Sequence, residues 1–168
     1  MSSIKEFEIL KHLGKGSYSN VYKVKRKTDG KFYAMKKVKL PKLSQKERKN
    51  SLNEVRILAS IQHPYIISYK DAFYDNNSRT LCIVMEFAGS GDLLNKIKSM
   101  KSRRKYFSED KIWMYLIQMI KAIKTLHEMK ILHRDLKSAN VFISEDEKSI
   151  KLGDLNVSKV MKKGLQQT

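Results

Sequence analysis

The character of the sequence changes near residue 87, and this change constrains the fold more than any other feature. Before it, the runs 21–26 and 31–38 are predicted to be β-strands. Thr28-Asp29-Gly30 separates these two runs, and Asp-Gly between strands is a strong hairpin signal. After the segment Gly89-Ser90-Gly91, which interrupts regular structure, the spacing of the apolar residues becomes largely helical. We therefore predict an α+β chain, with a small sheet and one helix, a hinge near residues 86–91, and a helical second part.

Further elements can be placed in the first part. Two more strands are expected around 67–74 and 80–87, joined by the turn Asp75-Asn76-Asn77. The run Ser44-Gln45-Lys46-Glu47 is a capping box, in which the serine accepts from the N3 amide and the glutamate reaches back. It predicts a helix whose apolar face carries Leu52, Val55, Leu58 and Ile61.

The second part contains one long helix by the same reasoning. Ser108 is its predicted N-cap. The helix is predicted to carry one stripe of six apolar residues at helical spacing: Ile112, Leu116, Met119, Ile120, Ile123 and Leu126. Two short strand-like runs follow at 140–143 and 149–152.

The charge is unusual for a chain of 168 residues, with 35 Lys and Arg against 17 Asp and Glu, a net charge of +18. Such a field attracts anions, and the basic residues are denser at 36–49 and 96–105. Charge alone names no partner, and a nucleic-acid-binding protein stays open as an alternative. The only cysteine, Cys82, lies in a run that predicts a buried strand. With no secretory signal and no apolar run of membrane-spanning length, we expect a cytosolic or nuclear protein.

A glycine pair lies between the first two predicted strands, in Gly14-Lys15-Gly16. Glycines let the backbone approach phosphate oxygens, although many plain turns also contain two of them. Lys36 follows on the next strand, and Glu54 lies in the middle of the predicted helix. A lysine held between two phosphates needs an acid to fix its ammonium group, so Glu54 is the candidate partner. Local pairing of Glu54 with Lys49 or Arg56 is the alternative.

The densest cluster of candidate catalytic residues is HRDLKSAN, residues 133–140. Asp135 can accept the proton of an attacking hydroxyl, and Lys137 can neutralise charge on a transferred phosphoryl group. Asn140 can bind magnesium, and Asp154 supplies an anionic ligand for the same kind of metal. The order and spacing of these elements indicate phosphoryl transfer.

These motifs together resemble a eukaryotic protein kinase of the serine/threonine type, from about Phe7 to the end of the chain. Four segments of the sequence are similar to the NIMA-related (Nek) kinases: GKGSYSNVYKVKR, NEVRILASIQHPYII, IVMEFAGSGDL and LGDLNVSKV. The resemblance implies a bilobal fold, with a kinase domain over 7–168, an N-lobe over 7–88 and the first part of a C-lobe over 89–168.

The resemblance also implies a role for each candidate residue. Lys36 and Glu54 form an ion pair, Asp135 is the catalytic base assisted by Lys137, and Asn140 and Asp154 hold Mg²⁺. The implied ATP-binding residues are Gly14, Lys15, Gly16, Val21, Ala34, Lys36, gatekeeper Met85, and the hinge residues Glu86 and Ala88.

The implied activity is transfer of the ATP γ-phosphate to serine or threonine hydroxyls of protein substrates. Arg134 resembles the arginine that meets an activation-loop phosphate, which implies an activating kinase or autophosphorylation. The expected location is the cytoplasm. Analogy with the family adds the nucleus, the centrosome and the cilium as further expected locations.

Three departures from the family pattern bear on this expectation. Ser19 stands in place of a third loop glycine, and Asp154-Leu155-Asn156 replaces Asp-Phe-Gly. Asn tolerates positive φ, so the second departure can keep the turn. The sequence ends at Thr168, inside the expected activation segment, so we expect uncovered apolar surface on the helical part. Two interpretations follow: a fragment of a longer Nek-like kinase, or an ATP-binding scaffold without catalysis.

Overall fold

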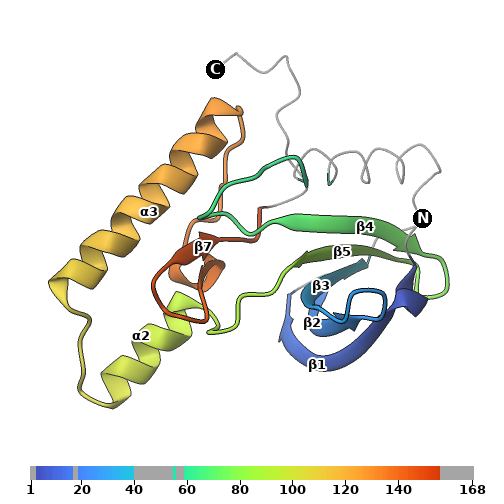
Figure 1. Cartoon of the computed structure of the whole chain (residues 1–168), viewed down its shortest axis with the longest axis horizontal. Helices are drawn as coiled ribbons and strands as arrows, with labels where there is room; N and C mark the ends of the chain where they lie inside the picture. Colours follow the sequence, from blue (N-terminus) through green and yellow to red (C-terminus); the bar gives the residue numbers. More distant parts are fainter. Residues whose placement is uncertain (1–2, 17–18, 40–54, 56–58, 156–168) are drawn as a thin grey trace. The chain divides into compact units, whose positions relative to one another are not determined.

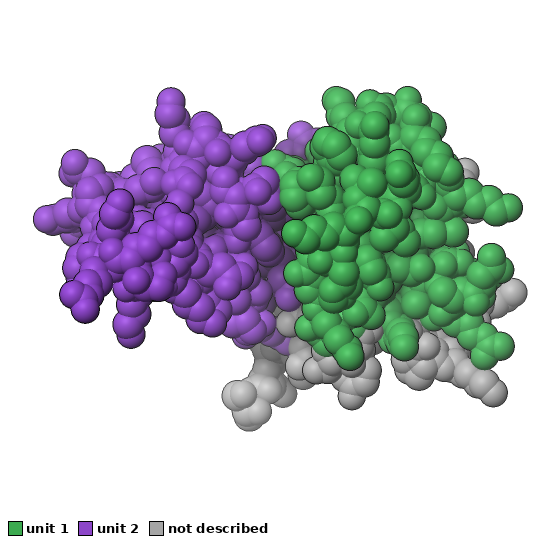
Figure 2. Space-filling model, turned by 90° about the horizontal axis from the view of Figure 1, so that it is seen from below, with its two compact units in different colours: residues 1–61, 68–87 green, residues 62–67, 88–168 purple. Residues whose placement is uncertain are grey.

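The computed structural model describes residues 3–16, 19–39, 55 and 59–155 of the chain. It divides into two compact units, one of residues 1–61 with 68–87 and one of residues 62–67 with 88–168 (Figure 2). Each unit has its own sheet, and each is described in turn.

The first unit contains a five-stranded antiparallel sheet (Figure 1). A short 3₁₀ helix, η1 (Ile4–Glu6), precedes the strands β1 (Phe7–Lys15), β2 (Ser19–Arg26), β3 (Phe32–Lys39), β4 (Tyr69–Asp75) and β5 (Thr80–Glu86). Their order in the sheet is β1-β2-β3-β5-β4. The strands predicted from the sequence are therefore present, and the sheet together with the helices of the second unit confirms the α+β class.

The β2–β3 hairpin forms where Asp-Gly predicts it. The Asp29 carboxylate accepts a hydrogen bond from the Lys31 amide at 2.9 Å, and the Tyr33 hydroxyl donates to the same carboxylate at 2.7 Å. Gly30 has a φ of 68°, in the left-handed region that glycine enters without a Cβ penalty. The local turn chemistry thus sets the register of β2 on β3.

One face of this sheet forms the hydrophobic core of the first unit. Its residues occupy alternate positions on β3 and β5, and β1, β2 and β4 contribute one each: Phe7, Val24, Tyr33, Met35, Phe73, Cys82 and Val84. The rings of Phe7 and Phe73 stack with centroids 5.9 Å apart. Cys82 is completely buried, which confirms the strand predicted around it.

The second unit combines two helices with a small hairpin (Figure 1). Its elements are α2 (Leu93–Ser102), α3 (Glu109–Glu128), the 3₁₀ turn η2 (Ser138–Asn140), β6 (Val141–Ile143) and β7 (Ile150–Leu152). Strands β6 and β7 pair antiparallel. Their residues Val141, Ile143, Ile150 and Leu152 have at most 1% exposure, so the hairpin lies at the centre of the unit's core.

Helix α3 begins as predicted but buries a different face. The Ser108 side chain accepts a hydrogen bond from the Lys111 amide, which confirms the N-cap. Of the six residues in the predicted stripe only Leu126 is buried, and Ile112 and Ile120 are more than half exposed. The buried residues of the helix are Tyr115, Gln118, Ala122 and Leu126. The β6–β7 hairpin packs against a face of α3 that carries polar hydrogen-bonding groups, so most of the apolar stripe lies outside the core.

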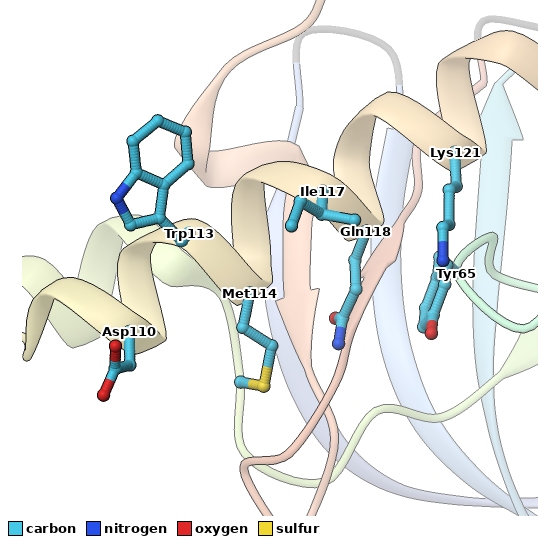
Figure 3. A pocket seen from close by; sticks show the side chains of 7 residues that line it. All are labelled: Tyr65, Asp110, Trp113, Met114, Ile117, Gln118 and Lys121. Atoms are coloured by element: carbon cyan, nitrogen blue, oxygen red, sulfur yellow. The ribbon is translucent and has the colours of Figure 1, made fainter.

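The opposite side of α3 presents apolar side chains to solvent, as expected for the helical part: Ile112, Trp113, Leu116, Ile117 and Ile120. A shallow hollow beside the helix is lined by Tyr65 and by residues of α3 (Figure 3). Gln118 leaves α3 on the same side as Met114 and away from Trp113. None of the predicted site residues lines this hollow.

Other sequence predictions fall partly outside the described residues. The capping box at 44–47, Leu52, Glu54, Leu58 and Asn156 all lie there. Of the predicted helix face, Val55 and Ile61 are described, and both are buried. In the described part of the chain, no helix is both long enough and apolar enough to cross a membrane.

Candidate active site

Five of the predicted nucleotide-binding residues share the face of the first unit's sheet opposite the core. Lys36 on β3 pairs with Val21 on β2, and Val21 pairs in turn with Gly14 on β1. Cross-strand partners share a face, and residues two apart on one strand do as well. Ala34 therefore lies on the same face as Lys36, together with its β5 partner Met85.

The predicted glycine loop is the connection between β1 and β2. Lys15 pairs with Asn20, and the Gly16 amide donates to the Ser19 carbonyl at 2.7 Å. A Cβ placed on Gly14 would meet no protein atom within 4 Å. Packing among the described residues therefore gives no reason for a glycine at position 14.

The predicted hinge begins at the end of β5. Glu86 exchanges two hydrogen bonds with Ser68: the Glu86 amide donates to the Ser68 carbonyl at 2.8 Å, and the Ser68 amide donates to Glu86 Oε2 at 3.3 Å. Met85 is buried, and Ala88, the first residue of the second unit after β5, is half-buried. The Glu86 side chain is thus engaged with main chain and does not extend into solvent as a free carboxylate.

The second unit brings Asp135, Lys137 and Asn140 into direct contact. Lys137 Nζ lies 2.7 Å from Asp135 Oδ2, and Asn140 Nδ2 donates to the same oxygen at 3.0 Å. Asn140 Nδ2 also donates to the Asp135 main-chain carbonyl at 2.8 Å. Both side-chain donors reach Oδ2, which leaves Oδ1 as the carboxylate oxygen for a further hydrogen bond.

The same contacts set the acidity of Asp135. The hydrogen bond from Lys137, followed by that from Asn140, lowers the pKa of Asp135 below its ordinary value, because both donors favour the ionised carboxylate. The group is therefore an anion at neutral pH. The Asp135 carboxylate is a weak base. It can orient an attacking hydroxyl group by accepting a hydrogen bond from it, and it can accept the hydroxyl proton as the hydroxyl oxygen reacts.

His133 connects this cluster to the segment that carries Asp154. His133 is buried; its Nε2 lies 2.9 Å from the Gly153 carbonyl, and its Nδ1 lies 3.4 Å from the Asp135 amide. A carbonyl only accepts and an amide N–H only donates, so a neutral imidazole with its proton on Nε2 satisfies both. The sequence prediction did not include His133 among the site residues, although it stands next to the motif's Arg134-Asp135.

Gly153 is a second site residue that the sequence prediction missed. A Cβ at this position would lie 2.7 Å from Cε2 of the Phe142 ring and 3.1 Å from Ile67 Cγ1. The Gly153 amide also donates to the Asn140 carbonyl at 2.9 Å. Close approach to β6 therefore requires glycine here, and it holds the next residue, Asp154, beside the Asn140 segment. Asp154 itself has a φ of 53°, a strained conformation for a side-chain-bearing residue.

Polar contacts from α2 and α3 hold the β6–β7 hairpin that connects Asn140 to Asp154. Glu147, in the turn of the hairpin, forms ion pairs with Lys96 of α2 and Lys111, near the start of α3. Gln118 donates to the Lys148 carbonyl at 3.2 Å and accepts from the Ile150 amide at 2.8 Å. We call these contacts of Glu147 and Gln118 the hairpin clamp.

The donor set fits a hard divalent cation. Asn140 uses its amide N–H groups on Asp135, so its oxygen Oδ1 is the atom that a cation would take, and Asp154 adds a carboxylate. In the described part of the chain no group of three or more His, Cys, Asp or Glu residues could hold a metal. Few protein ligands are typical of Mg²⁺, which keeps waters and shares the oxygens of a bound phosphate. Asn140 and Asp154 therefore fit Mg²⁺, whereas a closed Zn²⁺ site would need more ligands.

Of the predicted site residues, Glu54 lies outside the described part of the chain. The remaining ones divide between the two units: those from Gly14 to Glu86 belong to the first, and Ala88, the Asp135 cluster and Asp154 belong to the second.

Comparison with known proteins gives consistent results over most of the chain. The sequence model of the protein kinase domain family matches residues 7–168 of the chain. The chain is 40% identical over 163 residues to the probable serine/threonine-protein kinase nek2 of Dictyostelium discoideum, covering 95% of this chain and 39% of that protein. It is 39% identical over 152 residues to serine/threonine-protein kinase Nek1 of Mus musculus, covering 90% of this chain and 12% of that protein.

A third relative is the G2-specific protein kinase nimA of Emericella nidulans, 35% identical over 183 residues, with 93% of this chain and 26% of that protein covered. The chain thus spans well under half the length of these relatives. The sequence resemblance to NIMA-related kinases is confirmed, and the chain belongs to the protein kinase domain family.

Proposed function

We propose that the protein is a Nek-like serine/threonine kinase that transfers the γ-phosphate of ATP to hydroxyl groups of protein substrates. The observation that carries the proposal is the Asp135 cluster, in which Lys137 and Asn140 both hold one carboxylate oxygen. The family match and the names of the relatives support the same reaction.

In this proposal Oδ1 of Asp135 accepts the hydrogen of the substrate hydroxyl. Oδ2 stays bound to Lys137 and Asn140, so the carboxylate cannot rotate away from the hydroxyl. The lowered pKa keeps the group ionised, and the hydroxyl oxygen is oriented for in-line attack. The Lys137 ammonium lies beside Oδ2 of Asp135 and can neutralise charge on the transferred phosphoryl group.

The nucleotide would be bound by the residues on the sheet face of the first unit. Val21, Ala34 and Met85 offer apolar surface to the base, and Lys36 offers an ammonium group to the phosphates. The open space over Gly14 would let a phosphate approach the backbone closely. When bound, Mg²⁺ would neutralise phosphate charge, with Asn140 and Asp154 as its protein ligands.

The proposal extends to regulation and location. Arg134 is exposed, so it is accessible to a phosphate on the activation segment, added by another kinase or by autophosphorylation. A cytoplasmic location is favoured by the single cysteine, which cannot form a disulfide within the chain, and nucleus, centrosome or cilium are variants by family analogy.

The test is Mg-ATP binding and phosphoryl transfer by the chain and by the longest protein that contains it. Mg-ATP should raise the melting temperature, and Lys36→Met should abolish this rise. Asp135→Asn should keep the rise and remove transfer to a serine or threonine peptide, since it alters the base and leaves the nucleotide residues intact. Transfer unchanged by Asp135→Asn would refute the assignment. Binding without transfer in the longest protein would favour the scaffold interpretation.

A further inference from the structure

Figure 1 shows the backbone of α2 and of the turn after it. The end of this helix and the turn carry an exposed cluster of positive charge. Residues 93–108 contain no Asp or Glu. Lys96 is engaged in the hairpin clamp, but the remaining basic residues of this stretch are exposed. We call them the basic turn: Lys98, Lys101, Arg103, Arg104 and Lys105. Among the described residues, none of the five forms an ion pair.

The backbone of the basic turn places an arginine where glycine is favoured. The Lys105 amide donates to the Met100 carbonyl at 2.9 Å, and the Arg104 amide donates to the Lys101 carbonyl at 3.0 Å. These two bonds form a Schellman motif, whose left-handed position is usually glycine. Arg104 occupies that position with a φ of 53°. The chain therefore carries a positive charge at a position where glycine would relieve backbone strain.

Apolar side chains stand among these charges. Ile97 is 40% exposed, and Tyr106 is 90% exposed. At 3.6 residues per turn, Ile97, Lys98 and Lys101 lie within about 100° of one another around α2. Tyr106 directly follows the last cation of the turn. The surface thus combines cations with an aliphatic and an aromatic group, both facing solvent.

We propose that the basic turn is a docking surface for an anionic lipid membrane. Lys and Arg bind acidic headgroups. A tyrosine and an exposed aliphatic residue are more stable at the headgroup–acyl boundary than in water. A single-stranded nucleic acid would also attract the cations and stack on Tyr106, but it offers no apolar environment for Ile97. The inference is independent of the proposed phosphoryl transfer.

The test measures cosedimentation of the whole chain with phosphatidylcholine vesicles, with and without phosphatidylserine, at physiological salt. Each basic residue near an anionic surface strengthens binding about fivefold. The variant Lys98→Gln/Lys101→Gln/Arg103→Gln/Arg104→Gly should therefore lose roughly two to three orders of magnitude in affinity for the acidic vesicles. The wild type should bind pure phosphatidylcholine weakly.

A matched control separates this surface from the overall charge. Lys5→Gln/Lys11→Gln/Lys25→Gln/Lys27→Gln removes the same charge from exposed positions of the first unit. Because the proposal assigns membrane binding to the basic turn, this variant should lose less than about fivefold in affinity for the acidic vesicles. Arg104→Gly alone should weaken binding about fivefold while keeping or raising the melting temperature. That result would separate loss of charge from misfolding.

Three results would overturn the proposal. The first is equal loss of binding in the control variant, which would assign binding to the overall charge. The second is tighter binding to single-stranded RNA than to acidic vesicles, with the same dependence on the basic turn. The third is no binding of the wild type to acidic vesicles.

Discussion

Replacing Gln118 by methionine is predicted to destabilise the second unit through loss of the hairpin clamp. Methionine has nearly the same length but no hydrogen-bonding amide. The Ile150 amide then loses its acceptor in a residue with no solvent exposure, and the Lys148 carbonyl loses a donor at an exposed residue. An orphaned buried N–H costs about 1–3 kcal/mol and a lost partly exposed bond about 0.5–1.5 kcal/mol. We expect a loss of about 3 kcal/mol in the free energy of unfolding.

The assay is urea unfolding followed by circular dichroism, with Gln62→Met as the matched control. Gln62 is exposed, so the same substitution there should change stability by less than about 0.5 kcal/mol. For a chain of this size, the Gln118→Met loss corresponds to a fall in melting temperature of about 6–12 °C. A loss below about 1 kcal/mol, or one no larger than that of Gln62→Met, would refute the clamp as the reason for burying this face of α3.

Three further predictions concern the site and the first unit. Gly153→Ala should cost about 1–3 kcal/mol in urea unfolding and reduce phosphoryl transfer, because the added methyl overlaps a neighbouring ring; unchanged stability would contradict the packing. Lys137→Met should raise the pKa of Asp135, since it removes the leading cause of the depression; carboxyl NMR titration would show this, and an unmoved pKa would contradict it. Ser78→Ala should destabilise by about 1–2 kcal/mol at pH 7, because the Ser78 hydroxyl is the main group lowering the pKa of Asp75. Stability from a depressed carboxylate is present above its unfolded-state pKa and is lost as pH falls through the lower folded-state pKa, so the cost should shrink below about pH 4; a pH-independent cost would contradict this reasoning.

Local sequence signals predicted the individual elements well because their physics is local. Asp29 and Gly30 form the β2–β3 turn through bonds within a few residues. The Ser108 cap likewise needs only the amide three positions later. The Asp135 cluster is also local, since its three side chains lie within six residues and meet through a single turn.

The positions of strained backbone were not predictable in the same way. Asn156 was the expected holder of positive φ and lies outside the described residues, whereas Asp154 adopts it at 53°. Gly153 beside it has no local turn signal. The need for glycine there comes from the Phe142 ring, which belongs to the paired strand β6.

The sequence by itself determined the α+β class, the turns, the helix cap and the set of chemically capable residues, because these depend on side chains close together along the chain. The tertiary structure decided which surfaces those elements bury. Insertion of β5 between β3 and β4 aligns Lys36 and Ala34 with Ile83 and Met85, across about fifty residues of sequence. On α3, hydrophobicity alone favours a stripe through Ile112 and Ile120. Gln118 is buried instead because its amide satisfies main-chain groups of the β6–β7 hairpin, about thirty residues away.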